Sequence, residues 1–246
     1  MSYIQIIYGG KNVGIADQAS IEPLKGCTNR CVGCYASKTT RIGKEFFDSV
    51  TLKEFNEEIF RKSCKKAKKD GIEFLRISKH CDPGHIIARE VVLEILNILS
   101  EYDIKAVFVT KCLEYEDKMA QTLISGNHIL HISLGMITQT KSDEERLLTW
   151  QKYKEKGVNA KTRLTLDVTK HLPKIFGGLK DEELIITPLR FPSKSIANEY
   201  NADLDSNFSY TNGYYKPKNV HESWSAFSNW CGEIGNKTLC CNCLTS

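Results

Sequence analysis

The sequence predicts an α/β protein, a partial (β/α)6 TIM-like barrel over residues 1–191 with an irregular C-terminal extension over residues 192–246. Strand-like and helix-like segments alternate about six times, which is typical of a parallel sheet with right-handed crossovers. Six repeats are fewer than the eight of a closed barrel. From Pro192 the chain is rich in Asn, Ser and Tyr and loses its hydrophobic period. The alternation alone also allows a doubly wound open sheet.

Six short apolar segments are predicted as strands. In chain order they cover residues 19–24, 72–78, 105–111, 128–136, 159–169 and 183–191. Ligands of such sheets gather at the carboxyl ends of the strands. We therefore expect the residues at these ends to face one cavity.

Helical segments are predicted between most of these strands. Residues 51–71 begin at Thr51 as an N-cap and stop at Gly71, and residues 88–103 and 114–125 follow with apolar residues at helical spacing. The last helix, over residues 142–157, has Ser142 as its N-cap and Gly157 as its C-cap.

The composition indicates a soluble globular protein, with 41% hydrophobic and 26% charged residues. The net charge of +4 is compatible with anionic substrates but is weak for a dedicated nucleic-acid binder. The first residues lack the pattern of a signal peptide, and no apolar stretch reaches the roughly 18 residues of a membrane span. A cytoplasmic protein without membrane contact is expected.

Ten cysteines are distributed in two clusters and three single positions. The first cluster is Cys27, Cys31 and Cys34, the second is Cys231, Cys240, Cys241 and Cys243, and the single positions are Cys64, Cys81 and Cys112. In a reducing compartment, clustered cysteines are metal ligands or catalytic groups more often than disulfides. The single cysteines are interpreted as core or pocket residues.

The first cluster has the spacing C-x3-C-x2-C directly after the first predicted strand. Thiolates are soft ligands that favour zinc or iron–sulfur clusters. Structural zinc sites usually have paired C-x2-C spacings and four protein ligands. This loop supplies three thiols, so an iron–sulfur cube held here would keep one iron open for a small molecule.

This loop, followed by β/α units, resembles the signature of the radical S-adenosylmethionine (radical SAM) superfamily over residues 19–191. The resemblance implies a 4Fe–4S cluster on Cys27, Cys31 and Cys34, with S-adenosylmethionine on the open iron. Reductive cleavage of S-adenosylmethionine then gives a 5′-deoxyadenosyl radical that abstracts hydrogen from a substrate. It also implies an external electron donor of the flavodoxin or ferredoxin type. "CYAS", "HISLGM" and "RLTLDV" are loosely similar to the spore photoproduct lyase-like branch.

Two features depart from the family pattern. The family has an aromatic residue just before the third cysteine to hold adenine, whereas Gly33 stands there and Tyr35 is the replacement we expect. "SKHCDPGH" takes the place of a glycine-rich motif that binds the methionine amino group. The resemblance thus assigns polar contacts with S-adenosylmethionine to a set of strand-end residues: Ser78, Lys79, Lys111, Ser133 and Arg163.

Structural roles are the alternatives for several of these residues. Ser133 can be a satisfied core hydroxyl, and Arg163 can pair with an acidic residue of the barrel. Residues 80–82 precede Pro83 and Gly84 in a good turn sequence. Within that turn, Cys81 is the candidate catalytic residue, as a pocket thiol that donates hydrogen or binds substrate.

The second cysteine cluster is predicted to hold a second, auxiliary iron–sulfur cluster, with zinc, a redox pair or free thiols as alternatives. The substrate of the enzyme is open: a nucleotide, a nucleic-acid base, a peptide or a small metabolite. The competing hypothesis is a zinc-stabilised module that binds nucleic acid or protein and has no redox chemistry.

Overall fold

The computed structural model describes residues 3–9, 19–29, 31, 34, 47–135, 142–211, 214–228, 230–234 and 237–239. Its centre is a seven-stranded sheet in the order β1-β2-β5-β6-β7-β8-β9. The strands are β1 (Ile6–Tyr8), β2 (Ala19–Ile21), β5 (Phe74–Ile77), β6 (Lys105–Thr110), β7 (Ile129–Leu134), β8 (Ala160–Leu166) and β9 (Leu184–Pro188). All neighbours pair in parallel except β1, which is antiparallel to β2.

The order of the six parallel strands follows the chain without a reversal. This differs from a doubly wound sheet, in which the strand order reverses at a switch point. Right-handed crossovers in one direction place the connecting helices on one side of the sheet. The sheet is open, because β1 and β9 are its two edges in the described part of the chain. All six predicted strands are present with shorter bounds, and β1 was not predicted.

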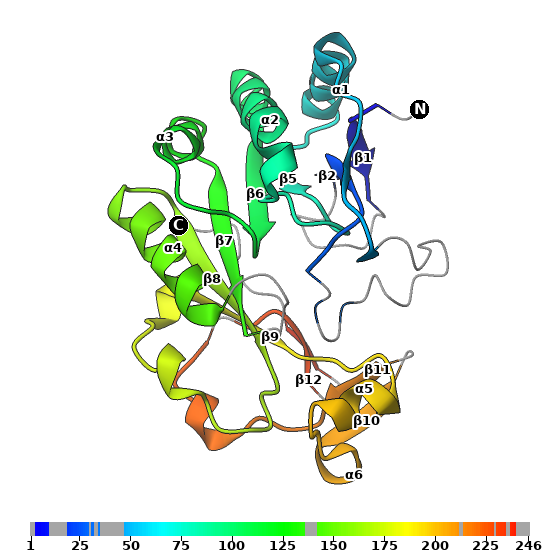
Figure 1. Cartoon of the computed structure of the whole chain (residues 1–246), viewed down its shortest axis with the longest axis vertical. Coiled ribbons are helices and arrows are strands. Elements are labelled where there is room, and N and C mark those ends of the chain that lie inside the picture. The colour runs from blue at the N-terminus through cyan, green and yellow to red at the C-terminus, as the bar shows by residue number, and fades with distance from the viewer. Residues whose placement is uncertain are drawn as a thin grey trace.

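Four helices accompany the strands: α1 (Glu57–Lys69), α2 (Arg89–Glu101), α3 (Asp117–Ser125) and α4 (Asp143–Glu155) (Figure 1). The predicted start at Thr51 is wrong, because Thr51 lies in β4 (Thr51–Leu52), which pairs with β3 (Leu24–Lys25). Asn56 caps α1 instead and accepts a 3.0 Å hydrogen bond from Ile59 N. The Ser142 cap of α4 is confirmed as a capping box.

The core lies between the sheet and these helices. Leu75, Ile77 and Phe108 of the sheet are fully buried, as are Ile95 and Leu96 of α2. Burial of one such side chain stabilises the fold by about 1.5–3 kcal/mol. Cys64 is also fully buried, on the inner face of α1, so its interpretation as a core cysteine is confirmed. No helix in the described ranges is long and apolar enough to cross a membrane.

The C-terminal extension is more regular than the sequence predicts. It contains α5 (Lys194–Glu199), α6 (Leu204–Asn207), the hairpin β10 (Phe208–Thr211) and β11 (Tyr214–Pro217), and the hairpin β12 (Gly232–Ile234) and β13 (Lys237–Leu239). Four short 3-10 helices also occur in the part of the chain that the structure describes: η4 (Ile86–Ala88), η5 (Lys174–Phe176), η6 (Asp181–Glu183) and η7 (Glu222–Trp224). Each element is too short to show a hydrophobic period.

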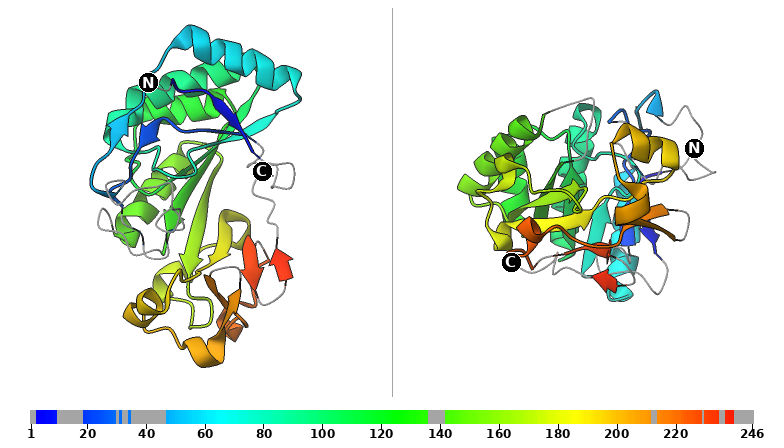
Figure 2. Two further views of the ribbon diagram at one scale, coloured as in Figure 1. Left: turned by 90° about the vertical axis from the view of Figure 1, so that its right-hand side faces the viewer. Right: turned by 90° about the horizontal axis from the view of Figure 1, so that it is seen from below.

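The extension packs at the carboxyl ends of the parallel strands, as two views show (Figures 1 and 2). Phe191 and Tyr215 exchange backbone hydrogen bonds of 3.0 and 2.9 Å. Phe191 is fully buried in a second small core with Leu204 and Phe208. Cys231 N donates a 2.7 Å hydrogen bond to Ile186 O of β9. These contacts bring the extension to the edge where the sequence predicts a cavity.

Candidate functional site

A cavity of about 430 Å³ lies at the carboxyl ends of the parallel strands. It brings together every predicted site residue that the structure describes: Cys27, Cys31, Cys34, Ser78, Lys79, Cys81, Lys111, Ser133, Arg163 and Cys231. Tyr35, Cys240, Cys241 and Cys243 lie outside the described residues. The expectation that the strand ends face one cavity is therefore confirmed.

The register of the sheet explains this gathering. Ser133 of β7 lies beside Arg163 of β8, and Thr165 lies beside Thr187 of β9. Since side chains alternate between the two faces of a strand, these four residues share the face that lines the cavity. Lys111 follows the end of β6, and its Nζ donates a 2.8 Å hydrogen bond to Ser133 Oγ. Ser133 is thus a polar group of the cavity wall and does more than fill the core.

The cysteine loop contributes a further part of the cavity lining. Gly26, with φ of 95°, turns the chain from β3 into the loop in a conformation that favours glycine. Cys34 N donates a 3.1 Å hydrogen bond to Cys31 O, which joins the second and third cysteines of the motif. The three thiols therefore reach one cavity from one loop.

The surroundings of Cys27 and Cys31 favour the protonated form of their thiols. Burial raises the pKa of Cys27 to about 11, and nearby Asp82 opposes the thiolate further. Burial also raises the pKa of Cys31, although Lys111 acts in the opposite direction. A bound metal centre offsets such shifts because it displaces the thiol proton. Among the described residues, no group of three His, Cys, Asp or Glu side chains is arranged to hold a single metal ion.

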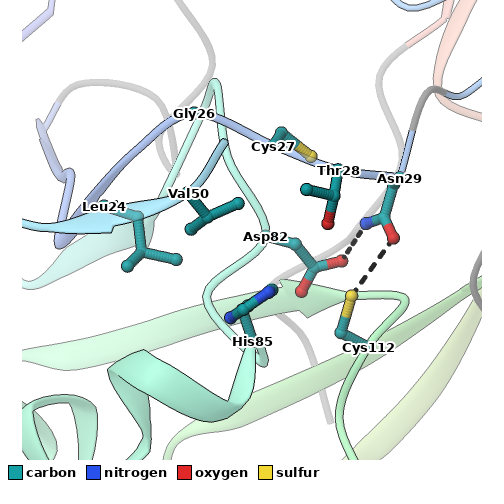
Figure 3. A pocket seen from close by; sticks show the side chains of 9 residues that line it. All are labelled: Leu24, Gly26, Cys27, Thr28, Asn29, Val50, Asp82, His85 and Cys112. Carbon is teal, nitrogen blue, oxygen red and sulfur yellow. Dashed lines mark hydrogen bonds between the residues drawn. The ribbon is translucent and has the colours of Figure 1, made fainter. Parts of the chain in front are cut away.

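Asp82 is a buried residue, 7% exposed, and its carboxylate fixes the loop to the sheet. Asn29 Nδ2 donates to Asp82 Oδ2 at 2.8 Å, and Lys111 N donates to the same oxygen at 2.7 Å. Gly84 N, at 3.0 Å, and the Thr110 hydroxyl donate to Oδ1. The Asn29 contact is visible in a small hollow beneath the loop (Figure 3). Asp82 therefore does more than form the predicted turn.

Cys112 completes this hollow. Its thiol donates a 3.1 Å hydrogen bond to Asn29 Oδ1, as Figure 3 also shows. Burial, followed by the charge of Asp82, raises the pKa of Cys112. Cys112 is therefore a neutral thiol that orients the Asn29 amide, so that its nitrogen faces Asp82.

A second buried carboxylate, Glu22, organises the segment after β5. Glu22 Oε2 accepts a 2.9 Å hydrogen bond from Ser78 Oγ, and Oε1 accepts one of 2.6 Å from Lys79 N. His80 Nδ1 lies 3.4 Å from Oε1. Burial alone raises the pKa of Glu22, but the hydrogen bonds from His80, Lys79 and Ser78 outweigh it and lower the pKa below its usual range. Glu22 is therefore a carboxylate at neutral pH.

Cys81 lies inside this network. Its Sγ is 3.4 Å from Glu22 Oε2 and 2.8 Å from Ser78 Oγ. Burial, followed by the charge of Glu22, raises the pKa of the Cys81 thiol. Ser78 has a φ of 64°, a strained conformation for a residue with a side chain. The strand end is thus held in a conformation that presents a protonated thiol to the cavity.

Arg163 reaches toward the extension. Its Nη1 donates hydrogen bonds to Thr187 Oγ1 at 3.2 Å and to Cys231 Sγ at 3.6 Å. Cys231, predicted as a ligand of a second cluster, therefore lies on the wall of the same cavity as the first cysteine cluster.

Several cavity residues were not found from the sequence: Asn29, Arg76, Thr187 and Arg190, together with Glu22 behind the wall. Glu22 carried the one available signal, since a lone acidic residue at the end of an apolar strand requires a partner when buried. Arg190 had no local signal, because contacts between distant segments bring it to the cavity.

No family model matches the chain, and no curated protein matches it either. Among solved structures, SuiB of Streptococcus suis bound to S-adenosylmethionine is 15% identical, with a TM-score of 0.50 over 74% of this chain and 43% of SuiB. The SuiB complex with its precursor peptide SuiA gives 15% identity and a TM-score of 0.51 over 69% and 38%.

The radical S-adenosylmethionine methyltransferase TsrM of Kitasatospora setae, with cobalamin and a [4Fe-4S] cluster bound, is 11% identical, with a TM-score of 0.45 over 69% of this chain and 36% of TsrM. The chain thus spans less than half the length of the proteins it matches. The likeness to SuiB shows that about 70% of the chain shares the fold of that S-adenosylmethionine-binding protein.

Proposed function

We propose that the chain is a radical S-adenosylmethionine enzyme. One observation carries this proposal: the thiols of Cys27, Cys31 and Cys34 line the same strand-end cavity as Lys111 and Ser133. The fold shared with SuiB, which was solved with S-adenosylmethionine bound, supports it.

The donor set of the cysteine loop fits an iron–sulfur cluster. Thiols are the ligands that such clusters prefer, and this loop offers three of them from one side of a cavity. When bound, the cluster supplies the electron that cleaves S-adenosylmethionine to a 5′-deoxyadenosyl radical. The hydrogen bonds of Asp82 hold the loop in place.

The remaining residues receive roles by their chemistry. Lys111 supplies a cation for the carboxylate of S-adenosylmethionine, and Ser133, hydrogen-bonded to Lys111, supplies a hydroxyl for the ribose. Ser78 and Lys79 line the wall where the methionine amino group binds, and Tyr35 stacks on adenine. Cys81 contacts the substrate as a protonated thiol.

Further parts of the proposal concern the whole chain. The six parallel strands curve into a partial barrel over residues 1–191, and residues 192–246 form a separate extension over its mouth. Cys231, Cys240, Cys241 and Cys243 hold an auxiliary iron–sulfur cluster. An external flavodoxin- or ferredoxin-type protein supplies the electron. The loose similarity to the spore photoproduct lyase-like branch belongs to this proposal as well.

Anaerobic reconstitution of the full chain with iron and sulfide tests the function. We expect stoichiometric iron and sulfide, a brown protein, and formation of 5′-deoxyadenosine from S-adenosylmethionine with dithionite, measured by mass spectrometry. Cys31→Ala should abolish this product. Cys64→Ala, which changes a buried cysteine of α1, should retain it. Stoichiometric zinc in a colourless protein after the same preparation would contradict the proposal.

A further inference from the structure

The cavity is strongly cationic. Five of its lining residues are Lys or Arg, namely Arg76, Lys79, Lys111, Arg163 and Arg190, whereas Asp82 is its one lining carboxylate in the described part of the chain. The Asp82 oxygens accept hydrogen bonds from Asn29, Thr110, Gly84 and the Lys111 backbone. S-adenosylmethionine contributes a single carboxylate of its own. The excess of cations therefore favours a second, anionic ligand.

The cations are spread along the strand ends. Lys111 follows β6, and its Nζ donates a hydrogen bond to Ser133 Oγ of β7. Arg163, which the resemblance also assigns to S-adenosylmethionine, lies beside Ser133 on β8, and its Nη1 contacts Thr187 of β9 and Cys231 of the extension. Arg190 follows β9 at the edge of the sheet, so that β7 and β8 lie between it and the strand of Lys111.

Backbone pairing with the extension fixes the position of Arg190. The next residue, Phe191, exchanges two backbone hydrogen bonds with Tyr215, and Phe191 is fully buried. The neighbours Arg190 and Tyr214 therefore come to the same wall, and both line the cavity together with Thr187. This wall combines two guanidinium groups with two hydroxyl groups.

We propose that Arg163, Arg190, Thr187 and Tyr214 form a subsite for the phosphate dianion of a phosphomonoester substrate; that this ligand is the substrate rests on the proposed function. Guanidinium groups bind phosphate oxygens through paired, charge-assisted hydrogen bonds. Two guanidinium charges match a dianion. A carboxylate carries one negative charge and two acceptor oxygens. This wall offers two positive charges and more hydrogen-bond donors than two oxygens need.

Equilibrium binding to the reconstituted full chain tests the subsite. Titration calorimetry would compare uridine 5′-monophosphate with uridine, and inorganic phosphate with acetate. We expect the nucleotide to bind at least about tenfold more tightly than uridine, because one charge-assisted hydrogen bond contributes about that factor. Its affinity should rise from pH 6 to pH 8, since the second ionisation of a phosphomonoester lies near pH 6. Phosphate should displace the nucleotide, and acetate should not.

Matched variants locate the binding. Arg163→Gln and Arg190→Gln should each weaken nucleotide binding about tenfold and leave uridine binding unchanged. Arg190→Lys, which keeps the charge but loses the planar fork, should fall between wild type and Arg190→Gln. Lys194→Gln removes an exposed charge from α5 and should bind like wild type. Circular dichroism of each variant shows whether it is folded.

Equal binding of nucleotide and uridine, competition by acetate, or unchanged affinity in both glutamine variants would overturn the subsite. The phosphate subsite and the radical function can be refuted independently of each other. If the chain forms 5′-deoxyadenosine but shows no preference for phosphate, only the proposed subsite is refuted. If the reconstituted chain binds the nucleotide through its phosphate but forms no 5′-deoxyadenosine, only the proposed radical function is refuted.

Discussion

Asn29 Nδ2 donates a 2.8 Å hydrogen bond to the buried carboxylate of Asp82, and this contact joins the cysteine loop to the end of the sheet (Figure 3). The same carboxylate accepts from Lys111 N at 2.7 Å. Asn29, which lies between Cys27 and Cys31, and Lys111, which follows the end of β6, thus share one anchor. The position of the three thiols relative to the strand ends depends on it.

Replacement of Asp82 by alanine should lower the free energy of unfolding by about 3 kcal/mol, because it leaves several buried donors without their acceptor. Urea denaturation of the reduced, metal-free chain measures this value without any contribution from a cluster. The control Glu90→Ala removes an exposed carboxylate that pairs with Lys118 at 2.9 Å, and it should lower stability by less than about 1 kcal/mol. Equal effects of the two variants would refute the anchoring role.

Ser78 combines backbone strain with side-chain hydrogen bonds, and two variants separate them. Ser78→Gly and Ser78→Ala both remove the hydroxyl that bonds to Glu22, but only glycine relaxes the φ of 64°. The glycine variant should therefore be more stable than the alanine variant by about 1 kcal/mol, measured by urea denaturation. At Ser63, inside α1, the order should reverse by about the same amount, since alanine is the better helix former. The same order at both positions would exclude strain at Ser78.

Sequence reasoning predicted the parts of the fold that depend on residues close together in the chain. The six parallel strands are apolar segments between turn residues. Ser142 caps α4 through hydrogen bonds with Glu145, which is only three residues away. The error at Thr51 shows the limit of this reasoning. Its partner is Lys25, which is 26 residues earlier in the chain, so a good N-cap residue became part of a strand.

Sequence reasoning identified cavity residues that lie at or beside a predicted strand end. It missed cavity residues that contacts between distant segments bring together. The cysteines, Ser133 and Arg163 could be found because each lies in or beside a predicted strand. The contact of Ser78 with Glu22 spans 56 residues and that of Asn29 with Asp82 spans 53. Such pairs leave no periodic trace in one sequence. Arg190 depends in addition on a hairpin of the extension, which is too short to be recognised.

The C-terminal cysteines can be tested by iron content. If they hold an auxiliary cluster, the double variant Cys240→Ser, Cys241→Ser should retain about half the iron of the reconstituted wild type, because one cluster of two is lost. Cys27→Ser, a matched change in the loop, should also lose about half the iron and should abolish 5′-deoxyadenosine formation. Iron content equal to wild type in the double variant would show that these cysteines bind no cluster.

His128 should make stability depend on pH. Its ring is fully buried; Nδ1 accepts a 3.0 Å hydrogen bond from Ala106 N, and Nε2 lies 3.0 Å from Leu96 O. Burial lowers the pKa of His128 from 6.5 to about 4, against the opposing effect of Leu96 O. The unfolded chain therefore binds a proton between these values and the folded chain does not.

The stabilisation from a neutral His128 is complete above about pH 6.5 and is lost as the pH falls toward 4. Between pH 7 and pH 5, wild type should lose about 2 kcal/mol more of its free energy of unfolding than His128→Gln, whose side chain does not titrate. Urea denaturation at both pH values gives the difference. His171→Gln removes an exposed imidazole and should keep the wild-type pH dependence. A wild-type slope in His128→Gln would mean that the acid sensitivity of the fold comes from other groups, such as the Glu22 carboxylate.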